Sequence, residues 1–386
     1  MVFTRSFSIT LLAALLLFAA FASGFLVHAH LYAHDNLPIL KQAYEVLVKH
    51  GWKAKPADPA LEYGMIRGML QAYNDPFTQF IEPIQHELES NALQGNFGGI
   101  GVGLGKDPQG YWVLHPFPEG PALAAGIIDG DRLLAIEGLQ ITPQTPPDTI
   151  QSAIRGPVGK SLLLTIGRSP DFTPLQIKVR RAEIPLPSVT WHLAAGEPRV
   201  GVIEINLIAA TTAGEIQNAV ENLQSQGALY YLLDLRNNPG GLLSAGVDIA
   251  RLFLKQGVVI EQQYQGQAIE TMRVVQPGPF TEIPLAVLIN ESSASAAEII
   301  AGALQAHQRA ILVGSPSFGK DSIQLVFDLP DGSSLHVTAA RWWVPGLNPP
   351  IGGHGLQPDV LVPASSQAAG PEMVLQAAVA ALLEGN

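Results

Sequence analysis

The chain has 386 residues, enough for two or three domains, and its 47% hydrophobic and 14% charged residues exclude extended disorder over most of its length. A formal net charge of −11 argues against a nucleic-acid-binding protein, because such proteins present basic surfaces to phosphates. The absence of cysteine excludes disulfide frameworks, zinc–thiolate sites and a thiol nucleophile.

The first predicted element is an apolar segment without charged side chains, Ile9–Val27. Its length matches that of a helix crossing the roughly 30 Å core of a bilayer. The small residues Ala22-Ser23-Gly24 leave a cleaved signal peptide as the alternative, but they lie inside the apolar run, which favours an uncleaved anchor. We therefore expect residues 1–30 to be an anchor or signal segment, with the rest of the chain periplasmic or extracellular at the cell membrane.

Residues 31–95 are predicted to be a helical region. From Asn36 to about Asn91, apolar residues recur at three- and four-residue spacing, and the pattern breaks at Asp75-Pro76.

Residues 96–182 have a different pattern, with short strands, many turns and the glycine-rich stretch FGGIGVGLG. The glycines do not fit the G-x-G-x-x-G spacing of a dinucleotide-binding loop. This segment resembles a PDZ domain in the order of its elements: a glycine loop, a strand, the helix GPALAAG, the hairpin GDRLLAIEG and then IRGPVGKSLLLTIGR. The resemblance implies a loop whose backbone N–H groups bind the free carboxylate of a peptide that adds as a strand to the sheet edge. The implied peptide-binding residues are Gly98, Gly99, Ile100, Gly101 and Val102.

Residues 183–386 alternate predicted strands with predicted helices, which is typical of an α/β layer architecture with some parallel pairing. The predicted strands are Val200–Leu207, Leu229–Asp234, Leu285–Asn290 and Ala310–Val313, and the predicted helices are Thr212–Leu223, Leu242–Leu254 and Ala296–Ala306.

The stretch GSPSFGKD, Gly314–Asp321, fits most of a phosphate-binding P-loop, but two features exclude that function. Asp321 stands where a hydroxyl should bind magnesium. The following SIQLVFDLPDG also alternates like a strand, whereas a P-loop leads into a helix. Binding of a nucleotide phosphate therefore does not account for Lys320.

A serine nucleophile needs a base, and no histidine of the chain stands in a familiar triad spacing. The chain resembles the C-terminal processing peptidases in three stretches that follow one another in this order: DLRNNPGG, NESSASAAEIIAGAL and FGKDSIQ. Members of that family combine a serine/lysine pair with an embedded PDZ domain. The resemblance covers nearly everything after the apolar segment. It implies Ser295 as nucleophile, Lys320 as general base and Gln324 as the residue that orients the base. Three positions depart from the family pattern: Ser292 and Asp321, where glycine is usual, and Ala297, which replaces a serine that is not catalytic.

The local sequence leaves two interpretations of Ser295 open. It follows a predicted strand and begins a predicted helix, where the Ala296 N–H and the positive helix end could stabilise an oxyanion. Gly240 or Gly241 could supply a second N–H. Alternatively, Ser295 and Glu298 form a capping box, and Ser295 only caps the helix. Asp234 and Arg236 are interpreted as scaffolding.

To act as a base, Lys320 must be neutral, which burial among apolar side chains would favour and a nearby carboxylate would oppose. In an extended segment Lys320 and Gln324 would lie too far apart for easy contact, so we expect a bend around residues 320–322. Asp321 tolerates a left-handed backbone better than most replacements of glycine.

The sequence thus predicts a multidomain α+β and α/β protein: an N-terminal helical segment, a PDZ domain and an α/β serine peptidase core. It predicts a serine endopeptidase that recognises C-terminal tails of exported or unfolded proteins, without cofactor, metal or nucleic acid, with a membrane-anchoring helix and a possible homodimer. The alternative is a catalytically silent PDZ scaffold that only binds peptides.

Overall fold

The computed structural model describes residues 37–56, 58–362 and 371–384. The chain divides into two compact units, Met1–Ile66 and Arg67–Asn386. The predicted membrane segment Ile9–Val27 lies outside the described residues. Within the three described ranges, no helix is long and apolar enough to cross a membrane.

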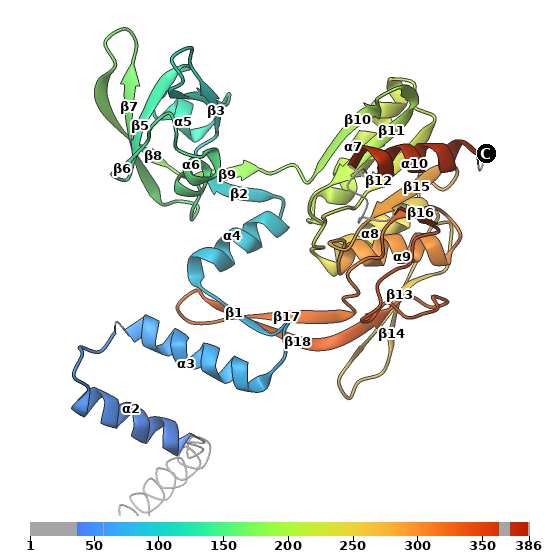
Figure 1. Cartoon of the computed structure of the whole chain (residues 1–386), viewed down its shortest axis with the longest axis horizontal. Helices are drawn as coiled ribbons and strands as arrows, with labels where there is room; N and C mark the ends of the chain where they lie inside the picture. The colour runs from blue at the N-terminus through green and yellow to red at the C-terminus, as the bar shows by residue number, and fades with distance from the viewer. Residues whose placement is uncertain (1–36, 57, 363–370, 385–386) are drawn as a thin grey trace, which may run out of the picture. The chain divides into compact units, whose positions relative to one another are not determined.

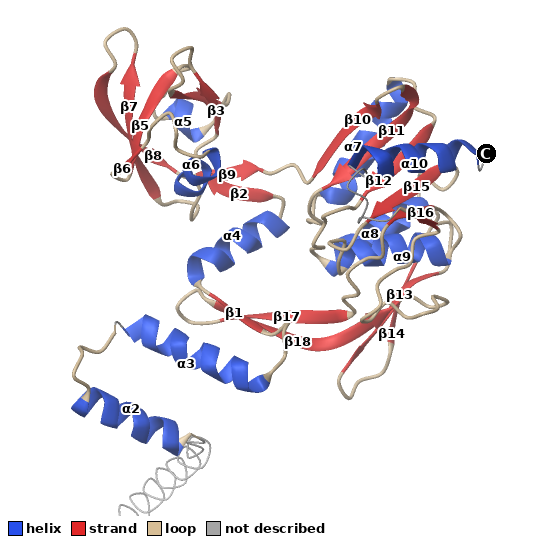
Figure 2. Cartoon of the chain, viewed as in Figure 1, coloured by secondary structure: helices blue, strands red, loops and turns tan. Residues whose placement is uncertain are grey.

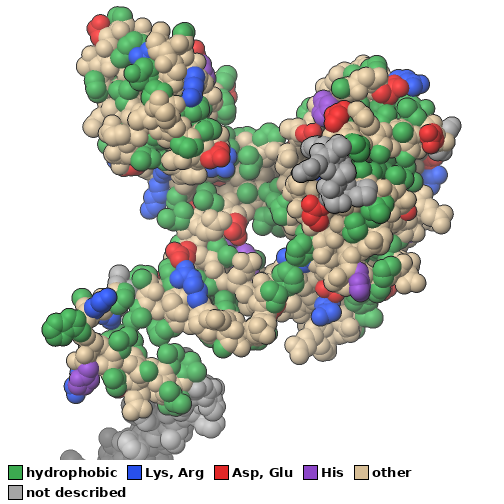
Figure 3. All heavy atoms as spheres, in the orientation of Figure 1, with side chains coloured by type: hydrophobic (Ala, Val, Ile, Leu, Met, Phe, Trp, Pro, Cys, Tyr) green, Lys and Arg blue, Asp and Glu red, His purple; other side chains and the backbone are tan. Residues whose placement is uncertain are grey.

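The first unit contains helix α2 (Pro38–His50) and the beginning of α3 (Asp58–Tyr73). Pro38 opens α2, a position where its missing N–H costs nothing, and Gly51 follows the last turn. None of the residues of α2 is buried. Hydrophobic side chains accordingly gather at the surface of this unit (Figure 3).

The second unit begins with the end of α3, strand β1 (Gln79–Ile81) and helix α4 (Pro83–Leu93). The helical prediction for residues 36–91 is correct for α2, α3 and α4 but wrong for β1. This strand pairs antiparallel with β18 (Ser334–Trp343), with Phe80 opposite Leu335. Because the partner lies far along the chain, local periodicity could not reveal the strand.

The predicted PDZ segment folds around its own hydrophobic core, which includes Ile100, Leu114, Leu133 and Ile166. Its antiparallel sheet has the order β3-β4-β5-β7-β8, with β6 paired to β5. A short pair, β2 with β9, joins the two ends of the segment. The bounds are β2 (Asn96–Gly99), β3 (Val102–Lys106), β4 (Trp112–Pro116), α5 (Pro121–Ala124), β5 (Asp131–Ile136), β6 (Leu139–Gln140), α6 (Pro147–Ile154), β7 (Ser161–Arg168), β8 (Thr173–Arg180) and β9 (Ala182–Pro185).

The remaining chain forms a mixed sheet of order β10-β11-β12-β15-β16-β19 (Figure 1). Only the β10–β11 pair is antiparallel; the pairs from β11 to β19 are parallel, which confirms the predicted α/β architecture. The strands are β10 (Val189–Ala194), β11 (Glu197–Ile205), β12 (Tyr230–Asp234), β15 (Leu285–Ile289), β16 (Ile311–Gly314) and β19 (Val360–Leu361).

Helices cover both faces of this sheet (Figure 2). Alternate residues of β12 face opposite sides: Leu233 packs with α7 (Thr212–Ser225), α8 (Leu243–Phe253) and α9 (Ala296–Ala306), whereas Leu232 packs with α10 (Pro371–Glu384). Strands buried on both faces read as continuous apolar runs, as in LAVLI of β15.

A second sheet has the order β1-β18-β13-β14, with β17 paired to the other edge of β18. Its further strands are β13 (Val258–Tyr264), β14 (Glu270–Arg273) and β17 (Ser322–Asp328). The segment after Gly314 leads into strand β17 and not into a helix. This confirms that Gly314–Lys320 is not a P-loop.

Candidate active site

Ser295 lies in the turn between β15 and α9, with a left-handed backbone (φ 55°, ψ −117°). Residues other than glycine adopt this region only where the surrounding structure imposes it. Here the buried Ser293 fixes the turn: its Oγ donates to the Leu235 carbonyl at 2.7 Å and accepts the Asn290 N–H at 2.9 Å. The turn therefore holds Ser295 in a strained, well-determined geometry.

The Asn-Asn-Pro-Gly-Gly turn after β12 packs directly against Ser295. The Ala294 N–H donates to the Asn238 carbonyl at 3.0 Å, and a Cβ on Gly240 would lie 3.0 Å from the Ser295 Cβ. Only glycine allows this close approach. The Gly240 N–H already donates to Asn238 Oδ1 at 2.8 Å, so in this structure it is engaged within its own turn. Of the predicted oxyanion donors, Ala296 and Gly241 remain.

Asn238 is fully buried, and its side chain also donates from Nδ2 to the Ile205 carbonyl at 2.5 Å. We expect Asn238→Ala to lower the free energy of unfolding by about 2–3 kcal/mol, because it leaves the Gly240 N–H and the Ile205 carbonyl without their partners. Chemical denaturation would measure this loss. The matched control is Asn222→Ala on the exposed face of α7, expected to cost less than about 1 kcal/mol. Equal losses for both variants would contradict the prediction.

Glu298, in the first turn of α9, is fully buried and accepts four hydrogen bonds. Its Oε2 receives the backbone N–H groups of Ser295 and Lys320, each at 2.9 Å. Its Oε1 receives the Ser317 hydroxyl at 2.6 Å and the Gly319 N–H at 2.7 Å. The backbone nitrogens of Ser295 and Lys320 are thus no farther apart than two 2.9 Å bonds laid end to end. One carboxyl group joins the two segments that carry the predicted nucleophile and base.

Lys320 lies in the loop between β16 and β17, half-buried. Burial lowers the pKa of its amine below the ordinary 10.5, and the Glu298 carboxylate opposes that shift. Burial in turn raises the pKa of Glu298, while its four hydrogen bonds act in the other direction. Among the described residues no hydrogen bond joins Lys320 Nζ to Ser295 Oγ, which is common for catalytic pairs without substrate.

The positions around Lys320 differ in part from expectation. The left-handed residue is Gly319 (φ 90°), not Asp321, whose carboxylate lies 3.5 Å from Arg341. The charge that acts on Lys320 comes from Glu298. Gln324 Nε2 donates to Ser322 Oγ at 3.1 Å and Thr338 Oγ1 at 3.4 Å, and no bond to Lys320 is found in the described part of the chain. Its orienting role stays a prediction.

Comparison with known proteins shows which family the chain belongs to. A model of peptidase family S41 matches residues 199–362, and a PDZ domain model matches residues 116–168. A carboxyl-terminal-processing protease of Picosynechococcus sp. is 39% identical over 334 residues, which are 86% of this chain and 78% of the relative. The chain belongs to this family of proteases.

A second curated relative agrees with this family. A carboxyl-terminal-processing protease of Synechocystis sp. is 34% identical over 333 residues, 85% of this chain and 76% of the relative. A solved structure, the photosystem II D1 C-terminal processing protease, is 28% identical and covers 86% of this chain and 89% of its own, with a TM-score of 0.46. The protein is therefore a serine-type endopeptidase of family S41 with a PDZ domain.

Sequence reasoning missed the connecting role of Glu298. The Ser-x-x-Glu spacing suggested only a helix cap, and the bond from the Ser295 N–H to Glu298 does close that cap. The two interpretations of this stretch are compatible, because the carboxyl group that caps the helix also binds the loop of Lys320.

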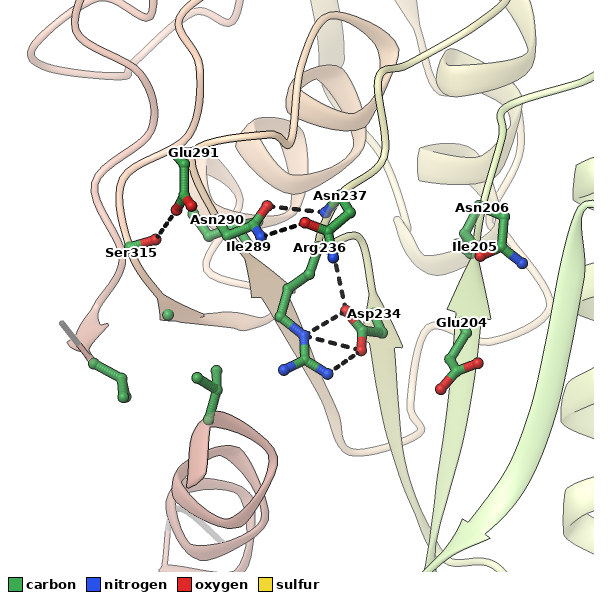
Figure 4. A pocket seen from close by; sticks show the side chains of 13 residues that line it. Glu204, Ile205, Asn206, Asp234, Arg236, Asn237, Ile289, Asn290, Glu291 and Ser315 are labelled. Atoms are coloured by element: carbon green, nitrogen blue, oxygen red, sulfur yellow. Dashed lines mark hydrogen bonds and ion pairs between the residues drawn. The ribbon is translucent and has the colours of Figure 1, made fainter. Parts of the chain in front are cut away.

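Asp234 and Arg236 line a polar pocket of about 440 Å³ at the carboxyl ends of β11, β12, β15 and β16 (Figure 4). The Arg236 guanidinium donates to both Asp234 oxygens, from Nε at 2.9 and 3.0 Å. The Arg236 N–H also donates to Asp234 Oδ1 at 3.0 Å. The pair closes the turn after β12, as expected of scaffolding, and the next residue, Asn237, is bound to Asn290 by two hydrogen bonds.

Proposed function

We propose that this protease cleaves substrates near a free C-terminal tail through an acyl-enzyme, with Ser295 as nucleophile and Lys320 as general base. The observation that carries the proposal is the buried Glu298 carboxyl, which accepts the backbone N–H groups of both residues. Ser295 and Lys320, 25 positions apart in the sequence, are thereby held close together.

The chemistry follows from the residues at that point. Neutral Lys320 accepts the Ser295 Oγ proton as Oγ attacks the scissile carbonyl, and the resulting ammonium gives the proton to the leaving amine. The oxyanion lies near the Ala296 N–H, because the first N–H groups of a helix have no intrahelical acceptor. The Gly241 N–H is the proposed second donor. Water, activated by the same amine, then hydrolyses the ester.

The PDZ segment supplies the proposed tail site. A pocket of about 190 Å³ lies between the glycine loop, β3 and α6. Its walls are mainly apolar, and the Arg155 guanidinium stacks over the Phe97 ring at 4.9 Å. This supports a tail that ends in an apolar residue, with its carboxylate held by backbone N–H groups of the stretch Gly98, Gly99, Ile100, Gly101 and Val102. In the structure Ile100 and Gly101 form the turn of this stretch, between β2 and β3.

The remaining parts of the proposal concern location and assembly. We propose that Ile9–Val27 anchors the protein in a membrane, with the protease on the extracytoplasmic side. The exposed apolar side chains of α2 support a contact with a second copy of the chain, or with the membrane surface. Carbonate washing of membranes tests the anchor, since an anchored chain stays in the pellet.

Recognition of the tail is tested with two unfolded substrates that differ only at the C-terminus, a free carboxylate in one and an amide in the other. With the detergent-solubilised full chain, kcat/KM is expected to be about 10–100-fold higher for the free carboxylate, because the amide loses charge-assisted hydrogen bonds. Equal rates for both substrates would exclude carboxylate recognition.

A further inference from the structure

The turn between α3 and β1 lies against Lys320, the proposed base, although most of the chain separates the two in sequence. Lys320 Nζ sits 5.2 Å from the centroid of the Phe77 ring. Phe77 belongs to the sequence NDPFT, which the sequence pattern marked only as the end of a helix. The contact therefore places a residue from the N-terminal part of the chain at the catalytic amine.

The turn that carries Phe77 is held from several sides. The Phe77 N–H donates to Asp75 Oδ1 at 3.1 Å, and the Thr78 hydroxyl donates to Asp75 Oδ2 at 2.5 Å. Thr78 Oγ1 also accepts the Thr338 N–H of β18 at 3.1 Å. Since Thr338 pairs with Gln324 of β17, the turn is fixed to the strands that follow Lys320. The position of the ring is thus fixed both by hydrogen bonds within its own turn and by the bond to β18.

We propose that Phe77 is a positioning residue for the base: its ring shields the Lys320 amine from water and so favours the neutral form. The inference rests on the proposed function, in which Lys320 accepts the proton of Ser295. Phe77 itself has no group that could exchange protons with the substrate.

Two effects of the ring oppose each other. Its face attracts an ammonium ion, which favours protonation, while its bulk excludes water, which disfavours it. Burial is the leading cause of the lowered pKa of Lys320, and the Phe77 ring packed 5.2 Å from the amine contributes to that burial. The charged neighbours are Glu298 of α9, which raises the pKa of Lys320, and His336 of β18, whose own pKa is lowered by burial and also by the charge of Lys320.

Phe77→Ala and Phe77→Leu separate the two effects, because leucine keeps an apolar barrier but has no π face. For Phe77→Ala, the acidic limb of the pH profile of kcat/KM is expected to move up by about one unit, which lowers activity at pH 7 about tenfold, with recovery at high pH. Phe77→Leu is expected to restore the limb close to its original position. Phe80→Ala, the same truncation three residues further along, is the control and should leave the limb in place.

The titration of the amine itself gives a readout that does not depend on activity. In the Ser295→Ala background, the pH dependence of acetylation at Lys320, followed by peptide mass spectrometry, should shift upward in Phe77→Ala and return in Phe77→Leu. Thermal melting checks that both variants fold. If the acetylation midpoint of Lys320 is unchanged in both variants, Phe77 only packs against the site and the proposal is wrong. If the midpoint falls in both variants, attraction of the ammonium to the ring dominates, which also contradicts the proposal. Failure of Lys320→Ala to lose activity would instead overturn the proposed function.

Discussion

Replacement of either Ser295 or Lys320 by alanine is expected to lower kcat/KM by at least about 10⁴-fold. In the proposed mechanism Ser295 forms the acyl-enzyme and Lys320 accepts the serine proton, so each variant lacks one of these two steps. Because the two residues act as a unit, the double variant should be no slower than either single variant. Such non-additivity is expected of a catalytic pair but not of two independent structural residues.

The measurement uses an unfolded substrate with a free C-terminal tail and the detergent-solubilised full chain. Binding of the tail, followed by fluorescence anisotropy, should be unchanged in both variants, because neither residue lies in the PDZ segment. Mass spectrometry after treatment with a fluorophosphonate should place the label on Ser295 in the wild type and show little label in Lys320→Ala. An inactive wild type that still binds the tail would instead support the catalytically silent scaffold.

Glu298→Gln is expected to produce the second largest effect, a loss of about 100-fold or more in kcat/KM. A glutamine side chain presents an NH₂ group where the carboxylate presented an acceptor, so at least one backbone N–H of the site loses its partner. The free energy of unfolding should fall by roughly 2–5 kcal/mol. Displacement of the Lys320 loop relative to Ser295 by even about 1 Å accounts for the kinetic loss.

The pH profile distinguishes this explanation from general damage. The Glu298 carboxylate raises the pKa of Lys320, so its removal should lower that pKa and move the acidic limb to lower pH, even as the maximum rate falls. The matched control is Glu291→Gln. Glu291 is an exposed glutamate in the turn after β15, and its carboxylate accepts a hydrogen bond from the Ser315 hydroxyl at 3.0 Å. We expect the control to keep its activity within about twofold. A shift of the limb to higher pH in Glu298→Gln would contradict the electrostatic argument.

The sequence by itself determined the layers of the fold and the parts of the site that are local. Apolar runs such as LAVLI predicted the buried parallel strands, and the helix from Ala296 to Ala306 was predicted with its observed bounds. The spacing of apolar residues and the capping of helices depend on residues within a few positions of each other, so a single sequence is enough to recognise them. The candidate pair Ser295 and Lys320 came from the resemblance of three short motifs, each of which is also local.

Only the tertiary structure decided how these local pieces combine. Glu298 appeared as a helix cap in the sequence, yet its second role depends on a loop that follows the rest of α9 and strand β16. Strand β1 and the ring of Phe77 take their places from β18, and Gln324 binds Ser322 and Thr338 where contact with Lys320 was predicted. The physical reason is the same in each case. A hydrogen bond or ring contact between residues distant along the chain leaves no period in the sequence, so only the packed fold specifies it.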